Sequence, residues 1–430
     1  MPICAMKLAV IGTGYVGLTT GACLAELGHV VVCHDIEDEK IKKLKNKVCP
    51  IFEVGLPELL VKHTGRSLFF TSSIKEAICE AEVIFICVGT PPKKEGGADL
   101  SAIDKVLENI GKNLDHYAII VEKSTVPVQT AEWMKSLLKK HLKTEFDIAV
   151  NPEFLREGTS VHDFLHPDRI VVGTESEKAD KIMTELYSKT EAPVIHTDLN
   201  SAELIKHSSN AFLSMKISFA NMVSRLCEKT GGSVSTVMDG VGWDTRIGRA
   251  FLNAGLGYGG YCFPKDLDAF IHIFEKHKVD CSLLKGVRSI NESQRLHALE
   301  IAKEMLGSLN GKTVGVLGLA FKPNTDDVRL SPACLLIEEL QKEGAKVRSC
   351  DPQAVENAQK ILKGVVFCKD AYEVAKGCDL LILATEWSDF KTMDLSKIKA
   401  HVTKFLDSRL VFDPARMRKL GFEYRCIGRS

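Results

Sequence analysis

The 430-residue chain lacks an excess of charge of either sign. Lysine and arginine together number 56, and so do aspartate and glutamate, which makes the formal net charge zero at pH 7. A chain without net charge has no long-range field that attracts nucleic acid or an acidic membrane. We therefore expect no nucleic-acid partner, and any anionic ligand must be held by local groups.

Long apolar runs are absent as well. No window approaches the roughly 18 apolar residues of a membrane span, and the start, MPICAMKLAVIGTG, has no basic segment before a long apolar one. The 14 cysteines include no CxxC pair and have no histidines at metal-ligand spacing. These absences predict no membrane association, no secretory signal and no metal site. They favour a cytoplasmic protein whose cysteines are mostly buried, reduced thiols.

The segment 6–35, MKLAVIGTGYVGLTTGACLAELGHVVVCHD, predicts a βαβ unit. Gly12 permits a tight turn, Gly14 lets a pyrophosphate approach the backbone, and Gly17 allows close packing of helix on strand. The helix N-terminus faces the phosphates. Asp35 follows the second strand, where a carboxylate accepts hydrogen bonds from both ribose hydroxyls and repels a 2′-phosphate. The unit therefore predicts NAD rather than NADP as cofactor.

Further strands are expected in 81–92, 116–127, 146–158 and 169–174. Ligands of parallel sheets bind beyond the carboxyl ends of the strands, where this chain places Thr90, Pro91, Ser124, Thr125, Asn151, Glu153 and Glu157. A single Thr or Ser at such a place more often caps a helix or forms a turn, and a carboxylate often faces solvent. Glu153 and Glu157 are four residues apart, so a helical turn would point both into one crevice.

Residues 199–231 have apolar side chains at helical intervals and no internal Gly or Pro, which predicts a long helix. Such a helix often connects two domains or forms a dimer interface. Lys206 and Asn210 share one of its faces, either as a satisfied buried polar pair or as functional groups.

A second α/β unit begins at 311–332, and 346–352, 365–368, 378–387 and 404–413 supply its further strands. Its GLGLAF turn is not a full dinucleotide fingerprint, which suggests another nucleotide or phosphate ligand. We expect an α/β fold of two Rossmann-like doubly wound domains joined by a long central helix. The expected regions, which fit a chain too long for one core, are 1–198, 199–300 and 301–430.

The chain contains, in this order, VIGTGYVGL, ICVGTP, EKSTVP, NPEFLREG, HPDRIVVG, GYGGYCFPKD and GLAFKPNTDDVR. These stretches resemble the successive motifs of the UDP-glucose/GDP-mannose dehydrogenase family across nearly the whole chain. FPKD and HPDR are most similar to the branch that acts on UDP-glucose. The resemblance implies oxidation of UDP-glucose to UDP-glucuronate with two NAD⁺, an N-terminal NAD domain, a C-terminal UDP domain and a homodimer formed through the central helix.

By this resemblance Cys262 is the nucleophile. One hydride leaves the C6 alcohol, the thiol adds to the resulting aldehyde to give a thiohemiacetal, and loss of a second hydride gives a thioester that water hydrolyses. We expect the glycines before Cys262 to admit the sugar, and a helix starting after Pro264 to favour the thiolate. Lys265 is expected to assist electrostatically.

The resemblance assigns the remaining catalytic roles. Lys206 and Asn210 are expected to stabilise oxyanion character at C6, and Asp266 to act with Thr125 and a water as base for alcohol oxidation. Glu153 is expected to activate the water that hydrolyses the thioester. The sequence leaves open which of these groups removes which proton.

The same resemblance implies two sets of binding residues. On the NAD side we expect Val10, Gly12, Gly14, Tyr15, Val16, Gly17, Asp35, Lys40, Thr90, Pro91, Ser124, Thr125, Glu157, Lys265 and Arg329. For UDP-glucose we expect Glu153, Phe154, Leu155, Arg156, Glu157, Lys206, Asn210, Asn253, Tyr258, Gly259, Phe321, Lys322 and Arg409, with Arg246 reaching a partner subunit's ligand. Any one of the basic residues is alternatively an ordinary surface charge.

Tyr261 departs from the family pattern, which usually has serine before the cysteine. It either points away from the sugar or reshapes the nicotinamide side of the pocket. Two alternatives remain open: a 6-dehydrogenase for GDP-mannose or another nucleotide sugar, and a non-catalytic NAD- and UDP-sugar-binding sensor. A generic 2-hydroxyacid dehydrogenase would share the first domain but has no use for a thioester-forming cysteine.

Overall fold

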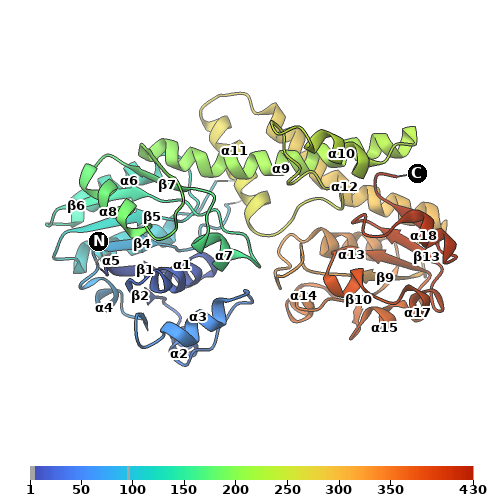
Figure 1. The fold of residues 1–430 in the computed structure, drawn as a ribbon, viewed down its shortest axis with the longest axis horizontal. Coiled ribbons are helices and arrows are strands. Elements are labelled where there is room, and N and C mark those ends of the chain that lie inside the picture. Colours follow the sequence, from blue (N-terminus) through green and yellow to red (C-terminus); the bar gives the residue numbers. More distant parts are fainter. Residues whose placement is uncertain (1–4, 94–96, 430) are drawn as a thin grey trace. The chain divides into compact units, whose positions relative to one another are not determined.

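The computed structural model describes residues 5–93 and 97–429, and its chain divides into two compact units. Unit 1 comprises Met1–Ser209 and Asp268–His277, and unit 2 comprises Asn210–Leu267 and Lys278–Ser430. Figure 1 shows the labelled elements of both. The boundary between the two units falls within two long helices, α9 (Leu199–Thr230) and α11 (Cys262–Lys276), so each helix contributes residues to both units. The 32-residue α9 confirms the predicted long helix.

Unit 1 contains one eight-stranded sheet. Its order is β3-β2-β1-β4-β5-β6-β7-β8, in which only the β6–β7 pair is antiparallel. The first six strands follow the order of a dinucleotide-binding fold. The strands are β1 (Lys7–Ile11), β2 (Val30–His34), β3 (Leu68–Thr71), β4 (Val83–Ile86), β5 (Ala118–Glu122), β6 (Phe146–Val150), β7 (Ile170–Thr174) and β8 (Val194–Thr197).

Helices cover both faces of this sheet. Side chains alternate along β1: Leu8 and Val10 join one core with α1 and α3, whereas Ala9 and Ile11 join another with α5 and α6. Strands β4 and β5 are buried along their whole length, as inner strands of a parallel sheet covered on both faces should be. The helices are α1 (Tyr15–Glu26), α2 (Asp38–Lys45), α3 (Leu56–His63), α4 (Ile74–Ile78), α5 (Ser101–Asn113), α6 (Thr130–His141), α7 (Ser160–Leu165) and α8 (Glu177–Leu186).

Unit 2 contains a six-stranded, all-parallel sheet of the same winding, in the order β11-β10-β9-β12-β13-β14. Its strands are β9 (Thr313–Leu317), β10 (Lys346–Cys350), β11 (Val365–Phe367), β12 (Leu380–Leu383), β13 (Lys404–Asp407) and β14 (Glu423–Cys426). Its helices are α10 (Val234–Gly242), α12 (Ser282–Leu306), α13 (Pro332–Lys342), α14 (Val355–Ile361), α15 (Ala371–Ala375), α16 (Ser388–Lys391), α17 (Leu395–Lys399) and α18 (Pro414–Lys419).

The structure confirms the predicted fold class: two Rossmann-like sheets connected through a long helix. Among residues 5–93 and 97–429, no helix combines the length and apolar character needed to cross a membrane. One local prediction is wrong. The segment 153–156 has no helical turn, so Glu153 and Glu157 do not share a helix face. Instead, the Glu153 carboxylate accepts the Leu155 amide at 2.6 Å, a local side-chain bond that competes with helical backbone bonds.

Candidate active site

The glycine loop after β1 has the geometry that a dinucleotide requires. Gly12 has φ +99°, and a Cβ on it would lie 2.8 Å from the carbonyl oxygen of Cys87. A Cβ on Gly17 would lie 1.9 Å from the Gly12 oxygen, so α1 packs directly on the turn. At Gly14, by contrast, no other described atom lies within 4 Å of such a Cβ. The backbone is therefore open at the position where a phosphate would approach.

Unit 2 contains a cavity of about 790 Å³, and unit 1 contains one of about 660 Å³. The cavity of unit 1 is lined by Gly12, Gly14, Asp35 and Lys40, among others. Asp35 is 7% exposed and its Oδ2 accepts hydrogen bonds from the Thr13 amide at 2.9 Å and the Thr13 hydroxyl at 2.7 Å. These residues fit a dinucleotide whose ribose carries no phosphate.

The surroundings of Asp35 stabilise the charged form of its carboxyl group. Burial alone would raise the pKa of this carboxyl group, but hydrogen bonds from Thr13, Glu37 and Lys40 lower it below its ordinary value. The ammonium of Lys40 lies 3.1 Å from Asp35 and 2.9 Å from Glu37. Lys40 thus lies beside the cavity, and its described partners are these two carboxylates.

Hydroxyl groups after β4 and β5 bind the neighbouring loop backbone. The Thr90 hydroxyl donates to the Thr125 carbonyl at 2.8 Å, and the Ser124 hydroxyl donates to the Val88 carbonyl at 2.7 Å. The His207 ring on α9 contacts the Val126 carbonyl at 2.7 Å. These bonds join the loops that carry three predicted site residues, Thr90, Ser124 and Thr125, and they give the first two the turn-forming role noted above.

Lys206 and Glu153 form a buried ion pair in unit 1. The Lys206 ammonium on α9 lies 2.9 Å from Oε1 of Glu153, and the two side chains are only 6% and 8% exposed. Oε2 of Glu153 accepts the Leu155 amide at 2.6 Å, which fixes the carboxylate after β6. The ring of Phe154 lies 5.5 Å from the same ammonium. The structure therefore brings together the predicted residues Glu153, Phe154 and Lys206.

Two buried carboxyl groups near this pair were missed in the sequence. Glu122 ends β5 and Glu203 lies on α9; they line a cavity of about 10 Å³ together with Thr125 and Lys206, about the smallest space that holds a water. Burial, and then the neighbouring carboxyl group of Glu203, raise the pKa of Glu122. A glutamate at the end of a fully apolar strand was the signal that could have revealed Glu122.

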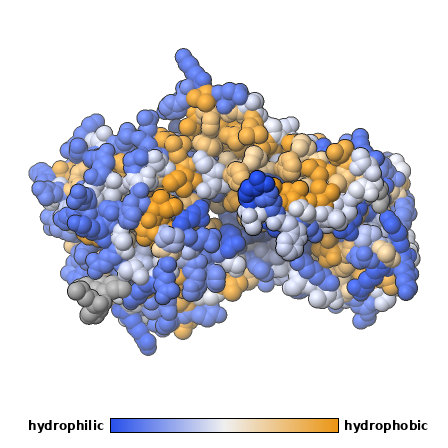
Figure 2. Space-filling model, turned by 45° about the horizontal axis from the view of Figure 1, so that its top comes forward, coloured by the Kyte–Doolittle hydropathy of each residue, from blue (hydrophilic) through white to orange (hydrophobic). Residues whose placement is uncertain are grey.

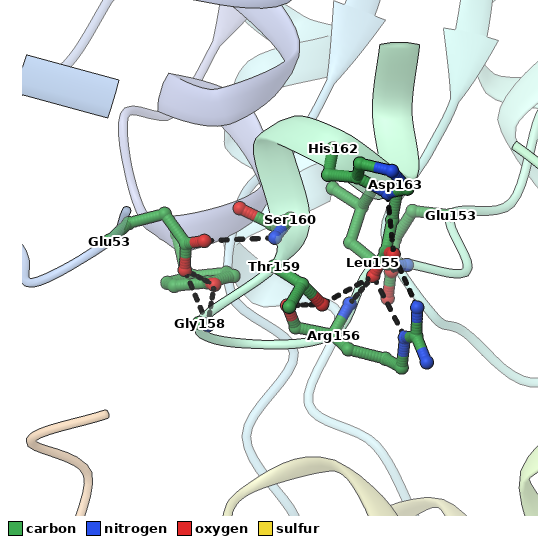
Figure 3. Close-up of polar contacts among 10 residues, drawn as sticks. Glu53, Glu153, Leu155, Arg156, Gly158, Thr159, Ser160, His162 and Asp163 are labelled. Carbon is green, nitrogen blue, oxygen red and sulfur yellow. Dashed lines mark hydrogen bonds and ion pairs between the residues drawn. The ribbon is translucent and has the colours of Figure 1, made fainter. Parts of the chain in front are cut away.

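The NPEFLREG segment, 151–158, is held by side chains of unit 1. Arg156 donates to Asp163 from its backbone amide at 3.0 Å, from Nε at 3.0 Å and from Nη2 at 2.6 Å (Figure 3). Although burial alone would raise it, contacts with Arg156 and Thr159 lower the pKa of Asp163. The guanidinium of Arg156 is thus engaged within the segment's own surroundings.

In unit 2, Asn210, Lys265 and Asp266 form a polar group. Asp266 is 2% exposed; its Oδ2 accepts from Nδ2 of Asn210 at 2.6 Å, and its Oδ1 accepts from the Lys265 ammonium at 2.6 Å. Lys265 and Asp266 belong to the first turn and a half of α11. The carboxylate is therefore paired with a cation and an amide, as a charge at this depth requires.

Cys262 is the first residue of α11 and is exposed. The helix begins at Cys262 itself, so the prediction of a start after Pro264 was three residues late. Pro264 fits the first turn because the amide it lacks has no helical partner there. At Cys262 the helix N-terminus favours a thiolate.

Each glycine of the GYGGYCFPKD loop lies where a larger side chain would clash with a neighbouring group. A Cβ on Gly257 would lie 2.5 Å from Oδ1 of Asn291, one on Gly259 2.3 Å from the Leu330 oxygen, and one on Gly260 2.8 Å from the Phe321 ring. Asn291 also accepts the Tyr258 amide at 2.8 Å. The loop is therefore packed against the body of unit 2, which contrasts with the flexible loop that its composition suggests.

Tyr261 packs against a predicted site residue. The guanidinium carbon of Arg329 lies 4.4 Å from the centre of the Tyr261 ring, and the Lys265 ammonium lies 5.5 Å from it. Two nitrogens of Arg329, Nε and Nη2, also donate to the carboxylate of Asp327 at 2.7 to 3.0 Å. Tyr261 thus holds Arg329 from one side while Asp327 holds it from another.

The cavity of unit 2 is rich in basic residues. Two predicted substrate-binding residues, Asn253 and Arg409, line it, and Arg409 Nε lies 2.7 Å from Glu386. Nη2 of Arg409 also donates to the Phe321 carbonyl at 3.3 Å. The basic residues lining this cavity that the sequence did not single out are Arg249, Lys391, Arg416 and Arg429. Arg246 does not line it; its side chain is 87% exposed and pairs with Asp244 at 2.6 Å.

The remaining predicted residues lie near these groups. Val10, Tyr15 and Val16 belong to β1 and the start of α1, and Lys322 lies 5.6 Å from the Phe321 ring. Pro91 follows Thr90 after β4, and Leu155 and Glu157 belong to the 151–158 segment. Within the described part of the chain, no three His, Cys, Asp or Glu side chains gather in a way that could hold a metal ion.

Comparison with protein families gives three matches that follow one another along the chain. Residues 6–191 match the NAD binding domain of the UDP-glucose/GDP-mannose dehydrogenase family, residues 200–293 its central domain and residues 315–419 its UDP binding domain. These three segments account for most of the chain.

Relatives are similar over almost their whole length. UDP-glucose 6-dehydrogenase TuaD of Bacillus subtilis is 46% identical, with 98% of this chain and 93% of that protein covered. UDP-glucose 6-dehydrogenase of Rhizobium meliloti is 40% identical, with 99% and 100% covered. The structure of a UDP-glucose dehydrogenase from the archaeon Pyrobaculum islandicum is 36% identical and superposes with a TM-score of 0.94, covering 100% of this chain and 99% of that one.

Proposed function

Because this chain belongs to the UDP-glucose/GDP-mannose dehydrogenase family, we propose that it oxidises UDP-glucose to UDP-glucuronate with reduction of two NAD⁺. The observation that carries the proposal is the similarity, at 40% and 46% identity over nearly the whole chain, to two curated relatives named for UDP-glucose. A 6-dehydrogenase for GDP-mannose or another nucleotide sugar is the less supported alternative.

NAD is the cofactor, bound by the N-terminal domain of the family. The open backbone at Gly14 and the helix N-terminus of α1 would hold the pyrophosphate, and the ionised Asp35 would hold the ribose. When bound, NAD⁺ accepts a hydride at each of the two oxidation steps. The remaining steps belong to the side chains of this chain.

The proposed nucleophile is Cys262. Its thiolate forms a carbon–sulfur bond to C6 of the aldehyde, and the carbonyl oxygen becomes the oxyanion of a thiohemiacetal. After hydride loss the carbonyl re-forms as a thioester. Water then adds to this carbonyl, the carbon–sulfur bond breaks, and the carboxylate and the free thiolate of Cys262 are released.

Four polar side chains and Thr125 have complementary proposed roles. The ammonium of Lys206 and the amide of Asn210 stabilise the oxyanion. Asp266, with Thr125 and a water, takes the proton of the C6 alcohol, and Glu153 takes a proton from the hydrolytic water. The Glu153–Lys206 pair supports this division, because it holds the carboxylate and the ammonium 2.9 Å apart in one buried place, with Glu153 also fixed by the Leu155 amide.

The nucleotide part of UDP-glucose suits the C-terminal UDP binding domain of the family. The basic cavity that contains Asn253 and Arg409 supports this proposal, because its arginines and lysine complement a diphosphate. Tyr258, Gly259, Phe321 and Lys322 are proposed to bind the same substrate, and Arg329 and Lys265 to act on the NAD side.

We further propose that the protein forms a homodimer through α9. Four large apolar residues of this helix, Phe212, Phe219, Met222 and Leu226, are 43% to 61% exposed and recur at intervals of seven, three and four. Figure 2 shows apolar side chains gathered at the surface along the long helices. Such a stripe on one helix face is typical of a subunit interface.

We also propose a cytoplasmic location. None of the thirteen cysteines within residues 5–93 and 97–429 forms a disulfide. A protein with so many cysteines outside disulfides suits a reducing compartment.

The decisive experiment offers the purified protein UDP-glucose, GDP-mannose and UDP-N-acetylhexosamines separately and follows NADH at constant NAD⁺. We expect turnover of UDP-glucose, with two NADH per UDP-glucuronate. Turnover of a different sugar nucleotide without turnover of UDP-glucose would refute the substrate assignment.

A further inference from the structure

Glu53 is a buried carboxylate outside every motif that the sequence singled out. It lies in the loop between α2 and α3 and is 3% exposed. Its Oε1 accepts the Ser160 amide at 2.8 Å, and its Oε2 accepts the Gly158 amide at 2.7 Å as well as the hydroxyl of Tyr15 (Figure 3). Both carboxylate oxygens therefore accept hydrogen bonds, and each of these three contacting groups is a donor.

The three donors come from two different parts of unit 1. Tyr15 is the first residue of α1 and directly follows Gly14 of the glycine loop. Gly158 is the last residue of the 151–158 segment, and Ser160 begins α7. The Tyr15 hydroxyl also accepts the Gly158 amide at 3.1 Å. One carboxylate therefore connects the loop proposed to hold the cofactor with the segment proposed to hold substrate and the hydrolytic carboxylate.

A simple capping role explains only part of this arrangement. A carboxylate beside the N-terminal amides of α7 stabilises that helix. However, α7 has only six residues, and Asp163, bonded to Thr159 at 3.0 Å and to Arg156, already fixes its first turn. The Tyr15 contact lies outside the cap and joins it to α1. Capping therefore accounts for the amide bonds but leaves the contact with the cofactor loop unexplained.

The chemistry of the three donors requires a carboxylate. A glutamine in place of Glu53 would keep one acceptor oxygen, but its NH₂ group would face an N–H or O–H donor. A buried donor without an acceptor is costly. The substitution Glu53→Gln therefore preserves shape and volume while it breaks one side of the connection.

We propose that Glu53 is a positioning residue of the dehydrogenase: it holds the glycine loop and the 151–158 segment in one arrangement, so that Tyr15 and Glu153 keep their places together. The proposal rests on the function proposed above. Glu53 acts through Tyr15 and the backbone amides of Gly158 and Ser160. The proposal includes no direct contact of Glu53 with substrate or cofactor.

The test compares Glu53→Gln, Tyr15→Phe and their double variant with the wild type and with Glu58→Gln, which changes an exposed glutamate of α3. Three properties are measured: hydrogen exchange of peptides covering 10–20 and 151–162 without ligands, NADH affinity by fluorescence, and kcat and KM for both substrates. We expect Glu53→Gln to lose exchange protection in both peptides. We also expect NADH affinity and kcat/KM to fall about tenfold each, which is what about 1.4 kcal/mol gives, and Glu58→Gln to match the wild type.

Tyr15→Phe keeps both amide bonds of Glu53, so it should fold normally. It therefore provides the test of the connection if Glu53→Gln does not fold. It should weaken NADH binding by a smaller factor, and the double variant should be no worse than Glu53→Gln, because both changes break the same connection. Loss of protection confined to 151–162, with unchanged NADH affinity and kcat/KM, would overturn the proposal and leave Glu53 as a cap of α7. Additive effects in the double variant would overturn it as well.

The two proposals fail in different ways. A wild-type protein that oxidises no UDP-glucose counts against the proposed function. Hydrogen exchange and NADH affinity do not require turnover, so they decide the role of Glu53 in either case.

Discussion

Replacing Glu122 by glutamine should change how the stability of unit 1 depends on pH. Glu122 is 2% exposed, and its Oε2 receives no hydrogen bond from the described residues. Its neighbour Glu203 accepts the amides of Gln129 and Ala131 at 2.6 and 2.9 Å. Burial raises the pKa of Glu203 to about 7, although these two amides oppose the rise. The pKa of Glu122 is raised well above its ordinary value, so Glu122 holds the proton that the pair shares.

The sign follows from the raised pKa of Glu122. The folded protein keeps a proton that the unfolded chain releases around the ordinary carboxyl pKa of 4.5. The stabilisation is thus fully present below that pH and is lost as the pH rises toward the folded pKa. One extra proton in the folded state lowers the free energy of unfolding by about 1.4 kcal/mol per pH unit.

Glu122→Gln removes this dependence, because an amide donates to Glu203 without titrating. As the pH rises above about 5.5, the free energy of unfolding of the variant should therefore rise relative to wild type by about 1.4 kcal/mol per pH unit until the folded pKa of Glu122 is reached. Urea unfolding at a series of pH values measures this difference, and comparison at each pH cancels the titrating groups outside the Glu122–Glu203 pair. The exposed Glu145→Gln is the matched control. Parallel curves for Glu122→Gln and wild type would refute the shared proton.

Four further outcomes are expected. Cys262→Ser should reduce steady-state NADH production by roughly three orders of magnitude or more while substrates still bind, and unchanged turnover would exclude the covalent mechanism. Gly14→Ala should keep the melting temperature and lower NADH affinity at least about tenfold. Gly12→Ala should lower the melting temperature itself, because Gly12 has a φ of +99° and lies close to the Cys87 carbonyl. Equal melting temperatures of the two variants would contradict this contrast. Tyr261→Ser should raise the KM for NAD⁺ about two- to fivefold, since a ring–guanidinium contact contributes about 0.5–1 kcal/mol, and an unaltered KM would separate the tyrosine from the cofactor. Leu226→Asp should shift the protein toward monomer in analytical ultracentrifugation, and an unshifted assembly would place the interface elsewhere.

The fold was predictable where one local signal sufficed. The glycines at 12, 14 and 17, with apolar strands on both sides, determined the first βαβ unit, and the long helix followed from its apolar period. Three short strands, β3, β8 and β14, were missed because each has only four residues and a mixed pattern. Their pairing with longer strands, rather than their own composition, stabilises them.

The candidate site was predictable residue by residue but not in its connections. Lys206, Glu153, Asn210 and Asp266 could be named from motifs, yet their pairing as Glu153–Lys206 and Asn210–Asp266 depends on contacts across 50 or more residues of chain. Glu53 belongs to no motif, and its partners lie up to 107 residues away. A side chain that accepts hydrogen bonds from backbone amides can have partners of any residue type, so no motif or spacing in the sequence identifies it.

Tyr261 illustrates how a departure from a family pattern becomes explicable. In the sequence it is an unexplained bulky residue before the nucleophile. In the structure its ring is 4.4 Å from the Arg329 guanidinium, whose charge Asp327 also holds. A serine at this position would remove the ring contact with Arg329, because it offers no ring face. The tyrosine therefore limits the directions in which Arg329 can turn, and it does so next to Cys262, whose thiolate an arginine or lysine nearby would favour.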